Sequence, residues 1–288
     1  MYKWVLIPLL AVIVVSPIII FYNTYTAHTL PHKLCSVVDN NTYITSSSEM
    51  TYNNISENVT IHFNGVNYCV FIYLTDIGNK PVTLHVTTLF KPNSTLRQLC
   101  CTFNIKIVNL ENNKTYVAFP QGREILPFIG PMNYTLYPHQ TIWFRDVLLY
   151  ICPPCNSSDR LWYSNLTTLL PGKYELIVCS FLNGFRHTPL VIKVPFDAKY
   201  PIGNYLVKHD GILYVILPQN ASEIKIDNTT GYLKEVSTYV YEITNSQQVC
   251  KNLKCISPAF PLKVSVLIDG KWYSAELLGV DYFPSEDI

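Results

Sequence analysis

The sequence predicts an all-β protein. Four dipeptides of the Asn-Gly or Asp-Gly type each separate two strand-like runs, and these are Asn64-Gly65, Asn183-Gly184, Asp210-Gly211 and Asp269-Gly270. Such dipeptides favour type I′ hairpin turns, because both central residues of that turn need positive φ. The flanking runs alternate apolar and polar residues, as Val59, Ile61 and Phe63 do. No stretch after residue 23 has the i, i+3, i+4, i+7 spacing of an amphipathic helix.

The first 22 residues form an apolar leader. The run from Trp4 to Tyr22 carries no charge and approaches the roughly 20 residues that a helix needs to cross a bilayer. Three interpretations stay open: an uncleaved signal-anchor helix, a cleaved signal peptide, and a buried hydrophobic strand. Lys3 and the α-amino group precede the run, which favours an N-terminus inside and the rest outside. The first two interpretations place the remaining chain at a cell surface or in secreted form.

The rest of the chain divides into three regions. Residues 23–57 are rich in Asn, Ser, Thr and Tyr, which predicts a glycosylated stalk, with or without one short strand. A change in composition at 194–201 suggests a boundary between a β-sandwich domain at 58–195 and a second, smaller β-rich domain at 196–288. One extended sandwich is the alternative. Beyond the four hairpins, alternating or apolar runs predict strands at 82–86, 101–107, 140–150 and 237–244.

Ten sequons agree with an exterior location. Each has the Asn-x-Ser/Thr pattern of an N-glycosylation acceptor, and none lies in the leader. Attached glycans would hydrate a chain in which only 14% of the residues are charged. The glycosylation candidates are Asn40, Asn54, Asn58, Asn93, Asn113, Asn133, Asn156, Asn165, Asn220 and Asn228.

Nine cysteines fit an oxidising compartment, where disulfides persist. Because the count is odd, at least one is free, modified or bonded to another chain. Cys152 with Cys155 would close one small loop and Cys250 with Cys255 another, while the pairing of the other five stays open. The disulfide candidates are Cys35, Cys69, Cys100, Cys101, Cys152, Cys155, Cys179, Cys250 and Cys255.

Motifs for catalysis or metal binding are weak. Cys152-Pro-Pro-Cys155 would exchange disulfides if a helix N-terminus lowered the thiol pKa, but the loop-like sequence NSSDR follows, which favours a structural disulfide. The seven histidines are scattered, and a copper site on Cys179 and His187 lacks a nearby Met. No hydrolase motif is present. The sequence therefore predicts no catalytic residue, no metal ligand and no cofactor.

Aromatic residues offer a possible recognition surface. The chain has 21 Tyr, a residue that suits both strands and binding surfaces. Strand packing accounts for most of them, and an exposed Tyr/Trp cluster for protein or glycan binding is the alternative. The tryptophan candidates for such a cluster are Trp143, Trp162 and Trp272.

Two stretches resemble immunoglobulin-like β-sandwich modules of secreted and cell-surface proteins. Residues 74–86 (LTDIGNKPVTLHV) are similar to two strands around a tight turn, and residues 169–178 (LLPGKYELIV) to a strand near the end of such modules. The resemblance covers about residues 58–195. It implies a sandwich in which Tyr174 lies at a corner between the sheets. Cys69 and Cys179 are too far apart in sequence for the antibody-type disulfide, so the resemblance implies architecture only.

These features together predict a membrane-anchored, glycosylated, disulfide-containing surface protein that acts in adhesion, spacing or partner binding. The net charge of +1 argues against nucleic acid as a partner. The expected partners are the membrane, through the N-terminal helix, and a protein or glycan. Oligomers through the odd cysteine or through strand edges are a further expectation. The alternatives are an extracytoplasmic enzyme or accessory module acting on glycans or thiols, a filament or virion surface component, and a metal-binding sandwich.

Overall fold

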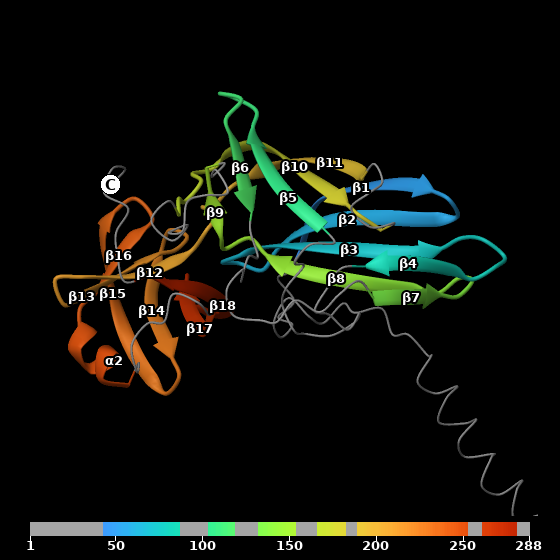
Figure 1. Cartoon of the computed structure of the whole chain (residues 1–288). Coiled ribbons are helices and arrows are strands. Elements are labelled where there is room, and N and C mark those ends of the chain that lie inside the picture. The colour runs from blue at the N-terminus through green and yellow to red at the C-terminus, as the bar shows by residue number, and fades with distance from the viewer. Residues whose placement is uncertain are drawn as a thin grey trace, which may run out of the picture. The chain divides into compact units, whose positions relative to one another are not determined.

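The protein is built almost entirely of β-strands. A computed structural model describes residues 43–86, 103–118, 132–153, 166–182, 189–252 and 261–280. Within these ranges the predicted all-β class is confirmed, and the one helix described is α2, Ser246–Asn252 (Figure 1). No helical pattern was recognised there, because a seven-residue helix is too short to show a repeating apolar stripe. None of the helices in these ranges has the length and apolar character that a membrane crossing requires. The apolar leader lies outside them.

Two antiparallel sheets form a sandwich (Figure 1). They enclose one buried hydrophobic cluster to which both contribute, with Ile61 and Ile72 from the first sheet and Leu176 and Val194 from the second. A two-stranded ribbon adds Leu84 and Leu136 to this core. The first sheet has the order β1 (Tyr43–Tyr52), β2 (Ile55–Phe63), β3 (Tyr68–Asp76) and β8 (Thr141–Val147). The second has the order β11 (Leu190–Ala198), β10 (Gly172–Ser180), β5 (Phe103–Asn109), β6 (Thr115–Ala118) and β9 (Ile151–Cys152), and the ribbon pairs β4 (Val82–Val86) with β7 (Met132–Leu136).

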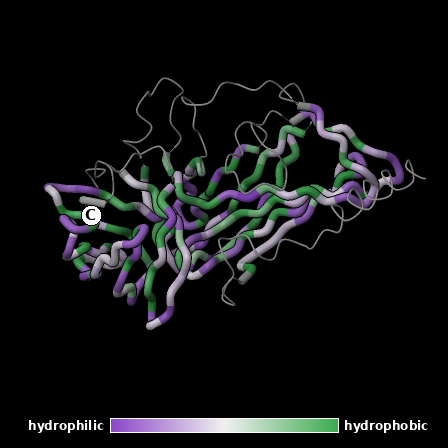
Figure 2. The backbone as a smooth tube through the Cα atoms, turned by 90° about the horizontal axis from the view of Figure 1, so that it is seen from below, coloured by the Kyte–Doolittle hydropathy of each residue, from purple (hydrophilic) through white to green (hydrophobic). Residues whose placement is uncertain are grey.

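The alternation of side chains explains why these strands pair face to face. In β10, Tyr174, Leu176 and Val178 are buried, whereas the residues between them are half-buried. Figure 2 shows hydrophobic and hydrophilic segments next to one another along the backbone. Alternate residues of a strand point to opposite faces of its sheet. Each sheet therefore has one apolar face, and the apolar faces of the two sheets pack against one another. The strands predicted at 82–86 and within 101–107 and 140–150 are confirmed as β4, β5 and β8.

The C-terminal strands close into a barrel. It has its own hydrophobic core, which includes Leu213, Val215, Ile224 and Val266, and α2 packs on β13 and β15. Among the described strands, β12 and β18 form the one parallel pair, which completes the ring. The barrel order is β12 (Tyr205–His209), β13 (Ile212–Ile216), β16 (Val240–Ile243), β15 (Thr229–Ser237), β14 (Ala221–Ile226), β17 (Pro261–Ile268) and β18 (Lys271–Val280).

Three of the four predicted hairpin turns lie within the described residues. Asp210-Gly211 and Asp269-Gly270 are two-residue turns with positive φ at both positions, as predicted (φ 49° and 81°, 48° and 75°). At Asn64-Gly65 the hairpin forms, but its loop runs from residue 64 to residue 67 and only Gly65 has positive φ. The Asn64 side-chain oxygen explains the longer loop, because it accepts hydrogen bonds from the amides of Val66 and Asn67. The strands flanking Asn183-Gly184 pair as expected, and the turn itself lies outside the described residues.

Residues 43–57 of the segment expected as a stalk belong to the first sheet. Residues 43–52 form the ten-residue strand β1, and a two-residue turn at Asn53-Asn54 (φ 46° and 64°) leads into β2. Asn tolerates the left-handed conformation that such a turn needs. The strand escaped the sequence analysis because β1 lies at the edge of its sheet and reads YITSSSEMTY, which is polar on both faces. Residues 23–42 lie outside the described part.

The loop after β2 joins the sandwich to the barrel. Val66 is fully buried and belongs to the hydrophobic core of the barrel. The side chain of Asn67 donates to Asn204 Oδ1 (3.0 Å) and to the carbonyl oxygen of Glu276 (2.9 Å), and its Oδ1 accepts from the amide of Glu276 (2.9 Å). Arg145 adds an ion pair with Glu276 (3.3 Å). A hairpin loop of the predicted first domain therefore supplies a side chain to the core of the predicted second one.

Candidate functional site

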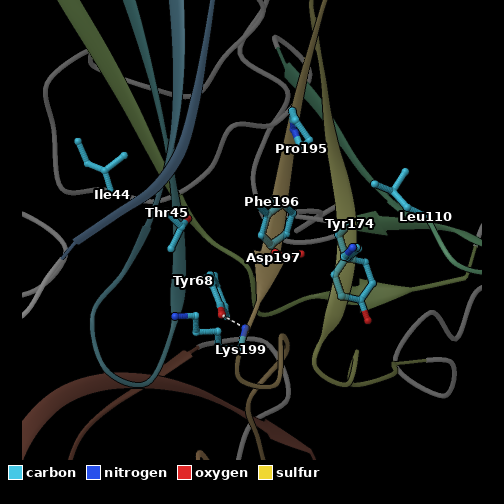
Figure 3. Close-up of a pocket in the computed structure, with 10 residues that line it drawn as sticks. Ile44, Thr45, Tyr68, Leu110, Tyr174, Pro195, Phe196, Asp197 and Lys199 are labelled. Carbon is cyan, nitrogen blue, oxygen red and sulfur yellow. Dashed lines mark hydrogen bonds between the residues drawn. The ribbon is translucent and has the colours of Figure 1, made fainter.

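A recess at the edge of the sandwich is the candidate binding site. It has a volume of about 540 Å³ and lies between β1 of one sheet and β10 and β11 of the other (Figure 3). Its lining consists of Ile44, Thr45, Tyr68, Leu110, Lys173, Tyr174, Pro195, Phe196, Asp197 and Lys199. The recess exists because β1 and β11 are edge strands that come together without pairing: Ser48 Oγ donates to the carbonyl oxygen of Lys193 (2.8 Å).

Three aromatic side chains form the inner wall of the recess. The ring centroid of Phe196 lies 6.0 Å from that of Tyr68 and 5.9 Å from that of Tyr174. Both phenol groups are held by the backbone: Tyr68 Oη accepts from the amide of Lys199 (2.9 Å), and Tyr174 Oη donates to the carbonyl oxygen of Leu170 (2.5 Å) (Figure 3). Burial, with smaller contributions from Tyr116 and Glu111, raises the pKa of Tyr174 to about 12. Tyr174 is therefore neutral at physiological pH, and the hydrogen bonds hold the rings of Tyr68 and Tyr174 in place.

Charged side chains lie at the rim of the recess. Lys173 and Asp197 are opposite one another in the register of β10 and β11, and both are exposed, as is Lys199. Thr45 is the one lining residue with an aliphatic hydroxyl, and its Oγ1 donates to the carbonyl oxygen of Ile61 (2.9 Å). Asp197 is the one carboxylate in this lining, and the Thr45 hydroxyl already donates to a backbone carbonyl. The lining residues therefore provide neither an acid–base pair nor an activated nucleophile. The arrangement suits binding through ring faces and rim charges.

The structure describes four of the nine predicted cysteines. Cys69, buried on β3, is disulfide-bonded. Cys179 and Cys250 carry free thiols, so the bridges expected for them are absent. Cys179 points away from the core between Val191 and Asn104, which are not cysteines, and Cys250 lies in α2 against the barrel core. The thiol of Cys152 donates to the carbonyl oxygen of Val117 (3.9 Å). The other candidates, Cys35, Cys100, Cys101, Cys155 and Cys255, lie outside the described residues.

Six of the ten sequons fall within the described residues. Five of their asparagines are exposed, and Asn58 on β2 is half-buried. Three of the exposed ones occupy positions with positive φ, where the side chain projects from a turn: Asn54, Asn113 and Asn220. The other exposed ones are Asn133 and Asn228. The remaining candidates, Asn40, Asn93, Asn156 and Asn165, lie outside the described part.

The tryptophan candidates do not form one exposed cluster. Trp143 is only 8% exposed and packs against Phe71. Trp272 lies on a barrel strand, with Lys225 Nζ 4.0 Å from its ring centroid, so a cation already covers one ring face. Trp162 lies outside the described residues. Where the structure describes the chain, it brings together no group of three His, Cys, Asp or Glu that would hold a metal ion.

The burial of three described acids, Glu57, Asp76 and Glu276, was not predicted from the sequence. Glu57 lies on β2 inside the sandwich core with no exposed surface, and its Oε1 accepts from Ser180 Oγ of the opposite sheet (2.5 Å). Its Oε2 is buried without a hydrogen-bond partner. Burial raises the pKa of Glu57 to about 7, against a smaller lowering by Ser180. The alternation along β2 could have predicted the burial of Glu57. Val59, Ile61 and Phe63 point into the core, and Glu57 lies two residues before Val59, on the same face of the strand.

The fold thus defines an all-β protein with a sandwich and a barrel and a recess on the sandwich edge. Comparison with known proteins adds no family: no family model matches the chain, and no curated protein is similar to it in sequence.

Proposed function

We propose that the chain is a glycosylated protein of the cell surface or exterior, held by its N-terminal apolar helix, that binds a protein or glycan partner. The observation that carries the binding role is the recess with its fixed aromatic wall and its rim of Lys173, Asp197 and Lys199. The exterior location is supported by the apolar leader and by the exposed asparagines of five described sequons. The hydrogen bond of Tyr174 to the carbonyl four residues earlier supports a module of the immunoglobulin-like kind, in which a corner tyrosine bonds upstream backbone.

Assembly through strand edges is the second candidate, and the structure gives it less support. β1 has a strand partner on one side only, which is the usual starting point for β-augmentation. However, its outer edge faces β11, as the contact between Ser48 and Lys193 shows. Addition of a strand from another molecule would have to displace that contact.

The exterior location is tested by tagging the C-terminus of the full chain in cells with a secretory pathway. We expect an antibody to reach the tag on intact cells, and we expect enzymatic deglycosylation to lower the intact mass. A variant lacking residues 4–22 is the control and should stay inside the cell without glycans. A full-length chain that is cytosolic, unglycosylated and fully reduced would contradict the proposal.

The recess is tested by reversing its rim charges. K173E/K199E should lower adhesion of cells that display the full chain to partner cells by about tenfold or more, because rim charges steer and orient a ligand. Folding should be unaffected, since both lysines are exposed. K234E, an exposed lysine on the barrel, is the matched control and should retain adhesion. Equal adhesion by all three proteins, at equal surface levels, would rule out the recess as the binding site.

A further inference from the structure

Three loops at one end of the sandwich expose large apolar side chains. They connect β1 to β2, β3 to β4, and β7 to β8, and Figure 1 shows all three at the same end. Tyr52 at the end of β1, and Ile77 and Tyr137 in the other two loops, are 44%, 46% and 60% exposed. We call these three side chains the apolar tip. Isolated exposed apolar residues are ordinary, but three on neighbouring loops require an explanation.

Backbone hydrogen bonds hold the loops of the apolar tip together. The amide of Ile77 donates to the carbonyl oxygen of Asn54 (2.7 Å), which ties the second loop to the first. The amide of Asp76 donates to the carbonyl oxygen of Gln140 (3.1 Å), which ties the second loop to the third. The buried Asp76 also accepts from the amide of Gly78 through Oδ1 (2.8 Å). The three side chains are therefore presented by one fixed framework.

A sequon lies within this framework. Asn54-Ile55-Ser56 begins in the tight turn between β1 and β2, where Asn54 is exposed with φ 64°. The Asn54 side chain extends over Gly78, because a Cβ added to that glycine would lie 2.9 Å from Asn54 Cβ. Tyr52 precedes Asn54 by two residues. A group attached to Asn54 Nδ2 therefore starts over Gly78, which has no side chain and directly follows Ile77 in the chain.

We propose that Asn54 carries an N-linked glycan whose first sugar packs on Tyr52 and Ile77 and covers the apolar tip. This inference rests on the proposed exterior location. In the transfer, a bond forms between Asn54 Nδ2 and C1 of the sugar, and the bond from C1 to the pyrophosphate of a lipid-linked oligosaccharide breaks. Nδ2 loses one proton and the lipid pyrophosphate leaves. The apolar C–H face of the sugar then meets the tyrosine ring, while its hydroxyl groups face water.

The position of the sequon favours a glycan over a protein as the occupant of the tip. A tethered sugar covers the side chains without the loss of translational freedom that a separate partner incurs. A glycan at Asn54 would also stand in the way of a protein that approached Tyr52 and Ile77.

The test uses the full chain purified from glycosylating cells. Glycopeptide mass spectrometry should find Asn54 modified, and N54Q should lower Tm by about 3 °C. N228Q is the matched control and should lower Tm by less than about 1 °C. Its asparagine is also exposed in a hairpin turn, but the residue two before it, Ile226, is buried and offers no ring to a sugar. In a Y52S background the effect of N54Q should fall to that of N228Q, because the two changes remove one contact.

The outcomes distinguish failure of the glycan packing at Asn54 from failure of the proposed exterior location. Absence of glycans at every sequon would overturn the exterior location. Glycans at other sequons with Asn54 bare would overturn this inference alone. The packing is wrong if Asn54 is modified but N54Q and N228Q lower Tm equally, or if Y52S leaves the effect of N54Q unchanged. Binding of a protein to the tip of the wild-type glycoprotein, lost on Y52S, would also overturn it.

Discussion

Replacing Gly65 by alanine is expected to destabilise the protein by about 3 to 5 kcal/mol. Gly65 has φ 96°, and a Cβ added there would lie 2.2 Å from Cδ1 of Tyr273 on the barrel. The methyl group cannot be accommodated unless the ring moves, and that ring packs against the barrel core. The loop that carries Gly65 also positions Val66 inside that core. Chemical denaturation of the purified protein measures the loss.

Gly270 is the matched control for Gly65. It also has positive φ (75°), but no atom lies within 4 Å of an added Cβ. G270A should therefore cost only the backbone strain of an alanine in that conformation, about 1 kcal/mol. Adding Y273A to G65A should recover part of the stability, because the clash partner is removed. If G65A and G270A are equally destabilised, a clash with the Tyr273 ring is not what destabilises G65A.

Short-range signals carried most of the fold prediction. Asp210-Gly211 and Asp269-Gly270 predict their hairpins because a type I′ turn requires positive φ at two adjacent residues, and Asp-Gly adopts this conformation readily. The turn at Asn53-Asn54 uses the same chemistry, but the strand before it alternates too weakly to be recognised. Edge strands such as β1 bury little surface and therefore need no apolar pattern.

Long-range contacts account for what the sequence did not reveal. The loop that begins at Asn64 contacts Tyr273 and Glu276 of the barrel, both more than 200 residues away in the chain, and no local pattern predicts those contacts. The recess likewise joins Thr45, Tyr68 and Phe196 from three strands, and no local motif relates them. Cys179 was a disulfide candidate by type alone, whereas its neighbours in the sheet decide that it has no partner. Such facts arise only when the strand order is known.

The buried Glu57 should make the stability of the protein fall as pH rises from about 5 to about 8. Burial raises its pKa from the ordinary value of 4.5 to about 7 in the folded protein. Below 4.5 the carboxyl group is protonated in both the folded and unfolded states, so it imposes no penalty. Between 4.5 and 7 the unfolded chain ionises first, and the free energy of unfolding declines until both states are ionised. The full loss is about 3 kcal/mol, reached above pH 7.

The surroundings of Glu57 explain why its ionisation is unfavourable in the folded protein. A charged Glu57 would keep the hydrogen bond from Ser180, but Oε2 would carry charge inside the core with no donor to stabilise it. E57Q mimics the neutral acid and cannot ionise. In urea denaturation between pH 5 and 8, the free energy of unfolding of E57Q should therefore lack the decline that Glu57 causes. The amide itself should lower stability somewhat at every pH. E235Q, at an exposed position on the barrel, is the control and should preserve the wild-type dependence. An unchanged pH dependence in E57Q would mean that the carboxyl group is already ionised and stabilised in the folded state, contrary to its burial between the two sheets.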